Sequence, residues 1–207
     1  METFARYGYR RASMDQVAEA ADLTRQALYH HFESKEALFR AVVEALHDGA
    51  LEAAASGGVR AEQAGSSLPD VLADQIEAKI RYVIERLQGS PHVEELLSEH
   101  QHQAGDLNQR SHEQMLALEV ATIERLAKAQ RLALRGGMSA LDLARSIQFA
   151  LRGDNELKLD MVTLDELARV VRLIVLGALE PKNLTSRPVK KPRAPQRARS
   201  RKSRSSR

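Results

Sequence analysis

Apolar residues recur every three or four positions along most of the chain, which is the spacing of helices that bury one face. No stretch shows the sustained alternation of apolar and polar residues that a half-buried strand requires. The sequence therefore predicts an all-α fold. We expect helices over about residues 1–7, 14–21, 25–31, 35–55, 69–88, 91–103, 108–135, 139–152 and 163–179.

Capping residues open the three helices that follow residue 12. Ser13 and Gln16 have the spacing of a capping box, in which the two side chains bond free backbone N–H groups at a helix start. Thr24 and Ser34 stand at the next two starts, and a hydroxyl there does the same. Residues 13–39 are therefore predicted to form two short helices, a tight turn between them, and the start of a longer helix.

Polar side chains gather on one side of the second short helix. A rotation of 100° per residue places Arg25, Gln26, Tyr29 and His30 on one arc and Leu28 opposite. Side chains of these types bond phosphates and base edges in DNA. On the pattern alone, two interpretations stay open: a DNA-reading helix-turn-helix, or an ordinary helix pair on an all-α core.

A long ordered run of residues decides between these interpretations. Residues 4–39 read F-x-x-Y-G-Y…S-M-x-x-V-A-x-A-A-D-L-T-x-x-A-L-Y-H-H-F-x-S-K-E-A-L-F. This run resembles the DNA-binding region of the TetR family of bacterial transcriptional regulators. Two departures are visible: Asp22 stands where the family usually has a glycine, and the first helix is short. We expect the native chain to begin upstream of Met1.

The resemblance implies roles for individual residues in binding double-stranded DNA. Arg25 and Gln26, with Thr24 and Ala27, would approach the bases. Phosphates would be held by Tyr29, His30 and Lys35 and by the amide end of the helix that begins at Ser13 and Met14. A palindromic operator would then be read by a homodimer whose two recognition helices lie about 34–36 Å apart.

The resemblance also implies a domain organisation. Residues 1–47 would be the helix-turn-helix DNA-binding domain, and residues 48–181 a helical ligand-binding and dimerisation domain. A small-molecule effector would occupy a pocket within residues 68–179, with His100 or His102 as polar contacts. The function implied is a repressor that the effector releases from its operator. No cofactor is expected.

The last two helices carry more apolar residues than one buried face needs. Phe149 lies off the stripe of the first, and Leu173 and Leu176 help to make the second apolar on nearly all sides. Such helices are covered on two sides, in a monomer core or at an interface. The resemblance favours a dimer interface, to which we assign Leu143, Ile147, Leu151, Leu167, Val171, Ile174 and Ala178.

Glycines and a capping box predict the remaining boundaries. Gly57 and Gly58 predict the end of the long fourth helix and a loop up to Pro69, which suits the first turn of the next helix. Thr163 and Glu166 have capping-box spacing at the start of the last helix.

The composition and motifs of the chain argue against several kinds of chemical site. The chain has no cysteine, which excludes disulfides, thiolate metal sites and cysteine nucleophiles. Four histidines fall within residues 92–112, but none has the spacing of a zinc site, so we expect no metal. No recognisable nucleophile-and-base or phosphate-loop motif occurs, so we expect no enzyme. Without a long apolar run we expect no membrane contact and a cytoplasmic location.

The net charge of +3 conceals two very different regions. Residues 182–207 hold 11 Lys and Arg and no acidic residue, which leaves 20 basic against 28 acidic residues in the rest of the chain. We predict that this tail is disordered, either simply solvated or an anchor on DNA phosphates. The alternative to a regulator is a helical ligand-binding or interaction protein without sequence-specific DNA binding.

Overall fold

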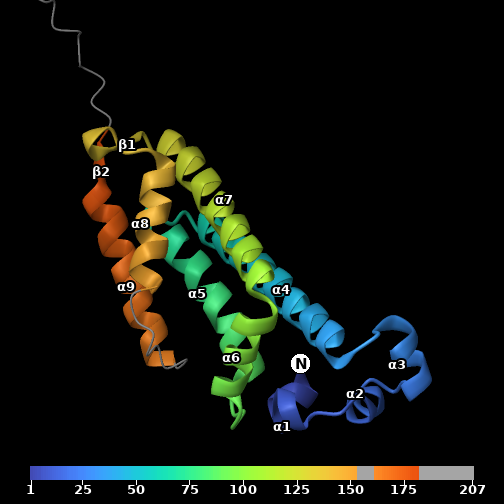
Figure 1. Ribbon diagram of the computed structural model, residues 1–207. Helices are drawn as coiled ribbons and strands as arrows, with labels where there is room; N and C mark the ends of the chain where they lie inside the picture. The colour runs from blue at the N-terminus through green and yellow to red at the C-terminus, as the bar shows by residue number, and fades with distance from the viewer. Residues whose placement is uncertain (153–160, 182–207) are drawn as a thin grey trace, which may run out of the picture.

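The computed structural model describes residues 1–152 and 161–181 (Figure 1). The predicted tail and most of the predicted loop before the last helix lie outside these residues. The described helices are α1 (Glu2–Arg11), α2 (Met14–Ala20), α3 (Arg25–His31), α4 (Lys35–Gln63), α5 (Leu68–Leu87), α6 (Val93–Gln103), α7 (Gly105–Ala129), α8 (Ala140–Arg152) and α9 (Met161–Ala178). The predicted all-α fold is confirmed.

The elements form two groups joined by the long helix α4 (Figure 1). Helices α1 to α3 lie at one end of the molecule, and α5, α7, α8 and α9 form a bundle toward the other. Helix α6 returns the chain from the bundle to α1, against which it packs. In the described part of the chain, no helix is both long and apolar enough to cross a membrane.

The predicted caps of the N-terminal helices are confirmed. Ser13 Oγ accepts a hydrogen bond from Gln16 N at 3.2 Å, and Gln16 Oε1 accepts one from Ser13 N at 2.9 Å. The hydroxyls of Thr24 and Ser34 accept from the amides three residues on, at 3.1 and 3.0 Å. Four side chains thus satisfy N–H groups that three helix starts would leave without a partner.

Helix α4 corrects the prediction that Gly57 and Gly58 end it, since it continues to Gln63. Both glycines are buried and face α5. A Cβ at Gly57 would lie 2.8 Å from Ala78 Cβ, and one at Gly58 would lie 2.6 Å from Gln75 Nε2. The glycines therefore serve close helix packing. The prediction that glycines end the helix failed because a glycine inside a helix is tolerated where close packing requires a small residue.

The end of α7 is a second correction. The predicted helix to residue 135 ends at Ala129, and Arg131 adopts a left-handed φ of 55°. Strand β1 (Leu132–Leu134) then pairs antiparallel with β2 (Leu179–Pro181), and a 3₁₀ turn, η1 (Arg135–Gly137), follows β1. Three residues are too few to show alternation in a sequence. Helix α9 begins at Met161, two residues before the predicted cap, and the side chain of Thr163 lies outside the described part.

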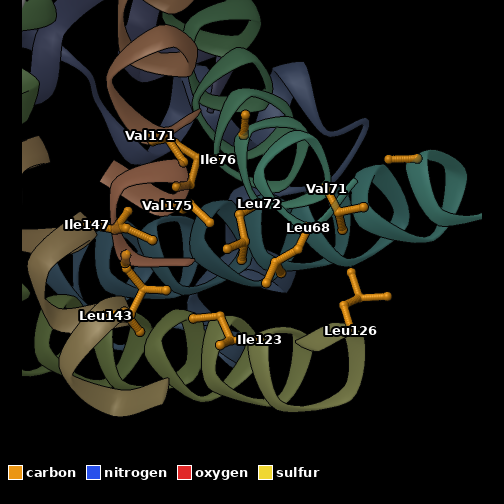
Figure 2. Packing of buried hydrophobic residues seen from close by; sticks show 14 of the residues in the cluster. Leu68, Val71, Leu72, Ile76, Ile123, Leu126, Leu143, Ile147, Val171 and Val175 are labelled. Carbon is orange, nitrogen blue, oxygen red and sulfur yellow. The ribbon is translucent and has the colours of Figure 1, made fainter. Parts of the chain in front are cut away.

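The larger hydrophobic cluster fills the bundle. Aliphatic side chains from α5, α7, α8 and α9 meet there, as Figure 2 shows for Leu72, Ile123, Leu143 and Val171. Each of these four is completely buried. We call this group the bundle cluster.

The stripe of residues predicted to form the dimer interface packs into this core within the single chain. Its members Leu143, Ile147, Val171 and Ala178 are buried within the chain, and Leu151, Leu167 and Ile174 are partly buried. The regular stripe of an amphipathic helix faces its own core. The surplus apolar residues lie on the surface instead: Phe149 is 80% exposed, Leu173 70% and Leu176 58%.

A second cluster surrounds the aromatic residues of α1 and α4. The Phe4 and Phe39 rings meet edge to face at 5.2 Å between centroids, and Tyr9 lies 4.8 Å from Phe39. Residues of α2 and α3 join it, and so do Leu87 of α5 and Leu96 of α6. We call this group the head cluster.

Candidate nucleic-acid interface and the adjoining cavity

The predicted reading face on α3 is exposed. Arg25, Gln26, Tyr29 and His30 all lie on the surface, whereas Leu28 is buried in the head cluster. The helix is thus held by one apolar anchor while its polar arc faces outward. The structure brings together the residues that the pattern placed on one arc.

Two contacts orient the arginine of this arc. Arg25 forms an ion pair with Asp15 of α2 at 2.9 Å, and its guanidinium lies 5.3 Å from the centroid of the Tyr29 ring. Both partners of the ion pair are largely exposed, so the bond is weak and a DNA phosphate or guanine can replace it at little cost.

Lys35, which is predicted to hold a phosphate, makes three hydrogen bonds within the chain. Its ammonium donates to the carbonyl oxygens of Tyr9 (3.0 Å), Arg10 (3.1 Å) and Ala12 (3.1 Å). An ammonium has three donors, and all three are used. Lys35 therefore ties the C-terminal end of α1 to the start of α4.

The other predicted contact residues divide by burial. Ser13 and Thr24 are exposed, and each hydroxyl already accepts a backbone N–H. Ala27 is partly buried, and the Met14 side chain is buried, so only the backbone amide of Met14 is left for DNA. Asp22 supplies the turn between α2 and α3 with a left-handed φ of 54°, a conformation that aspartate tolerates better than most residues.

Residues 1–42 match the family model described as "Bacterial regulatory proteins, tetR family". The match is confined to these residues, and it identifies them as a DNA-binding region of the kind found in this family of transcriptional regulators. Helix α3, with its exposed polar arc, lies within the matched region.

Two solved structures are similar to the whole chain. One is assigned to the TetR family of transcriptional regulators, from Mesorhizobium loti MAFF303099: it has 20% sequence identity and a TM-score of 0.56, over 85% of this chain and 89% of that one. The other is the TetR family transcriptional regulator PfmR from Thermus thermophilus, with 25% identity and a TM-score of 0.46, over 86% and 95% of the two chains. The first likeness extends the common fold beyond the matched N-terminal residues.

Behind this TetR-family head lies a cavity of about 560 Å³, within the range of small-molecule sites. Helix α4 supplies one wall, which corrects the expected pocket within residues 68–179. His100 lines the cavity as predicted. His102 is exposed and does not line it, because two residues along a helix turn the side chain to another side.

His47 is a cavity residue that sequence reasoning missed. Its Nε2 lies 2.9 Å from His100 Nε2, and its Nδ1 lies 3.3 Å from the carbonyl oxygen of Leu107. Because a carbonyl only accepts, His47 carries its proton on Nδ1, and His100 Nε2–H donates to His47 Nε2. The two histidines are 53 positions apart, so no local pattern could have paired them.

The two imidazoles are neutral near pH 7. Burial, and to a smaller extent the neighbouring ring, lower the pKa of His100 to about 4. Burial also lowers the pKa of His47. In the described part of the chain, no group of three or more potential ligands could hold a metal ion.

Direct bonds join the head to α6, which forms part of the cavity wall, and to the turn that precedes α6. Arg10 N donates to Glu95 Oε1 at 2.7 Å, and Ser90 Oγ donates to the Ala5 carbonyl oxygen at 2.6 Å. Gly8 kinks α1 at this contact with a φ of 76°. A Cβ there would lie 2.4 Å from Glu95 Oε2, so the junction requires glycine for two reasons.

Proposed function

We propose that the protein is a homodimeric repressor that binds a palindromic operator and releases it when a small molecule enters the cavity. Residues 1–47 would read DNA, and residues 48–181 would bind the effector and dimerise. The observation that carries the proposal is the exposed arc of Arg25, Gln26, Tyr29 and His30 on a helix anchored by buried Leu28.

The residue types of the arc suit the major groove. Arginine bonds O6 and N7 of guanine in a bidentate manner, and glutamine does the same with N6 and N7 of adenine. Arg25 and Gln26 lie in the first turn of α3, the part of a recognition helix that contacts base edges. Tyr29 and His30, one turn later, would then reach the phosphates.

Exposed apolar residues on α8 and α9 support a dimer. Phe149, Val170, Leu173 and Leu176 lie on the surface beside the buried stripes of the two helices. Exposed apolar groups of this size usually mark an interaction surface. Pairing with the same face of a second copy would cover them and would bring two reading helices to one palindrome.

The walls of the cavity suggest how an effector would act on DNA binding. Phe39, Val43 and Leu46 line it from α4, whose first residue, Lys35, is bonded to the end of α1. An effector that fits only one orientation of α4 would stabilise that orientation, and it would move both heads of a dimer. To relieve repression, it must bind the released form more tightly by several kcal/mol.

Selection of DNA fragments bound by the full chain tests the proposal. We expect a palindromic site, and we expect Arg25→Ala to lower affinity for it by roughly 10- to 100-fold, the value of one bidentate base contact. Lys128→Ala is the matched control, because Lys128 is exposed near the end of α7. If the Arg25→Ala and Gln26→Ala variants kept both wild-type affinity for the selected site and the wild-type preference for it over random DNA, the reading face would lie elsewhere.

The dimer has a separate test. We expect Leu173→Glu combined with Leu176→Glu to give a folded monomer in analytical ultracentrifugation, because two charges would then face two charges across the axis. A dimer of unchanged stability would show that this face is not the interface.

A further inference from the structure

We propose that the cavity binds a monocarboxylate with an apolar body, whose carboxylate lies against the ammonium of Lys79. This inference rests on the proposed function for its regulatory meaning, since the same cavity is the effector site. It names the chemical class of that effector.

The charges on the cavity wall are of one sign. Among the described residues that line the cavity, none is an aspartate or a glutamate. Lys79 of α5 contributes a cation, and His47 and His100 are neutral near pH 7 because burial lowers the pKa of each. A site of this composition favours an anion over a cation of the same size.

Lys79 lacks a close partner among the described residues, which give its ammonium no hydrogen bond or ion pair. The side chain is nevertheless partly buried, in the cavity wall. Burial lowers the pKa of Lys79, and the more distant charge of Glu119 opposes this effect. Glu119 is itself hydrogen-bonded to Gln148 at 2.5 Å, and burial raises its pKa to about 7. A carboxylate in the cavity would give the ammonium the counter-charge that its surroundings lack.

The rest of the wall fits a mostly apolar body. Phe39, Val43, Leu46, Val83, Leu87 and Leu96 provide hydrocarbon surface. Uncharged polar groups occur on the α6 and α7 side, among them Gln101, Asn108 and Ser111. These groups donate hydrogen bonds without adding charge. Met1 also lines the cavity, and burial lowers the pKa of its terminal ammonium, so we assign the charged side-chain contact of the ligand to Lys79.

A cationic or a neutral ligand fits less well. A cation would meet a partly buried ammonium, and none of the described lining residues is a carboxylate that could offset the repulsion. A neutral apolar molecule would fill the cavity but would shield the ammonium further from water without pairing it, which costs free energy. The carboxylate is the charge type that removes both penalties.

The test compares acids with their alcohols on the full chain. We would titrate decanoate against decanol, and 4-phenylbutyrate against 4-phenylbutanol, by calorimetry near pH 7. For at least one pair we expect the acid to bind about tenfold or more tightly than the alcohol, the value of a charge-assisted contact. Lys79→Met should bring that ratio close to one while alcohol binding persists, and Lys128→Met should leave the ratio unchanged.

A second variant guards against misfolding. Should Lys79→Met not fold, because Glu119 then stays buried without an opposite charge, the double variant Lys79→Met with Glu119→Gln removes both charges and should show the same loss of preference. Equal binding of acid and alcohol to the wild type, no binding of either acid, or a preference that survives the loss of Lys79 would overturn the inference.

Failure of the inference and failure of the proposed function give different results. Operator binding by the ligand-free protein tests the DNA-reading proposal and does not involve Lys79. An acid that binds with the expected preference but leaves the operator complex intact would contradict release by an effector, while the ligand class of the cavity would stand.

Discussion

The head cluster and the bundle cluster differ in their side chains and in the helices that supply them. The bundle cluster is aliphatic, and its side chains come from the bundle helices and from α4 (Figure 2). The head cluster is built around Phe4, Tyr9 and Phe39, and it needs Leu87 and Leu96 from the other side of the molecule. Helices α1 to α3 alone are therefore not a complete hydrophobic unit.

The cavity lies against the head cluster. Four of the residues that line it, Phe39, Val43, Leu87 and Leu96, are buried members of that cluster. Among the described residues, no buried member of the bundle cluster lines the cavity. A ligand there would touch the core of the DNA-reading head directly. Four substitutions, from the largest expected effect to the smallest, test the difference between the head cluster and the bundle cluster.

Phe39→Ala should have the largest effect. The ring is 1% exposed, and its loss should lower the free energy of unfolding by about 3–5 kcal/mol. Because α5 and α6 complete the head cluster, we expect one cooperative transition in urea, seen equally by circular dichroism and by DNA binding. Ile76→Ala in the bundle cluster is the comparison variant. Early loss of DNA binding with the bundle still folded would show that the head is independent.

Glu119→Gln should change how stability depends on pH. Burial raises the pKa of Glu119 from 4.5 to about 7, so the folded chain holds a proton that the unfolded chain has lost between these values. The contribution of this group to stability therefore falls as pH rises from 4.5 to 7, by about 3 kcal/mol at most. Relative to the wild type, the variant should gain stability over this range in urea unfolding. Glu124→Gln, at an exposed position of the same helix, should give a curve parallel to that of the wild type.

Gly8→Ala tests the junction of the head with α6. A left-handed φ of 76° and the approach of Glu95 should together cost about 1–3 kcal/mol. Gly65→Ala is the matched control, with a φ of 78° and no atom within 4 Å of the added Cβ. Thermal unfolding should separate the two variants, and an equal loss in both would mean that the Glu95 contact contributes nothing.

Gly57→Ala tests the packing of α4 on α5 in the bundle. Alanine favours a helix by about 1 kcal/mol over glycine, but the clash with Ala78 and the Asp74 carbonyl should outweigh this and leave a net loss of about 1 kcal/mol. Gly105→Ala, with open space around the added Cβ, should be neutral or slightly stabilising. Stabilisation by Gly57→Ala in urea unfolding would show that the two helices can move apart freely.

Local features of the sequence predicted the head well. The caps at Ser13, Thr24 and Ser34 involve residues three apart, and the exposed arc of α3 follows from helix geometry alone. The role of Lys35 could not be predicted in this way. Its three acceptors lie 23 to 26 positions earlier in the chain, and only the fold brings them to its ammonium.

The faces of α8 and α9 were likewise predictable in part from local sequence and in part only from the fold. The periodicity of the sequence showed that these two helices carry more apolar residues than one buried face needs. Which of them face the core depends on where α5 and α7 lie, and the structure places Leu143 and Val171 inside and Leu173 outside. The misplaced ends of α4 and α7 have a related cause, since Gly57 packs on α5 and β1 pairs with a strand from a distant part of the chain.

The sequence by itself determined the helices of the head, their caps, the polar arc of α3 and the resemblance of residues 4–39 to the TetR family. These depend on neighbours within about one helical turn, where residue type alone sets hydrogen bonding and facing. Only the tertiary structure decided that Lys35 supports α1, that His47 meets His100, and that Lys79 faces a cavity beside the head cluster. Contacts between distant residues depend on how whole helices pack, which no local pattern records.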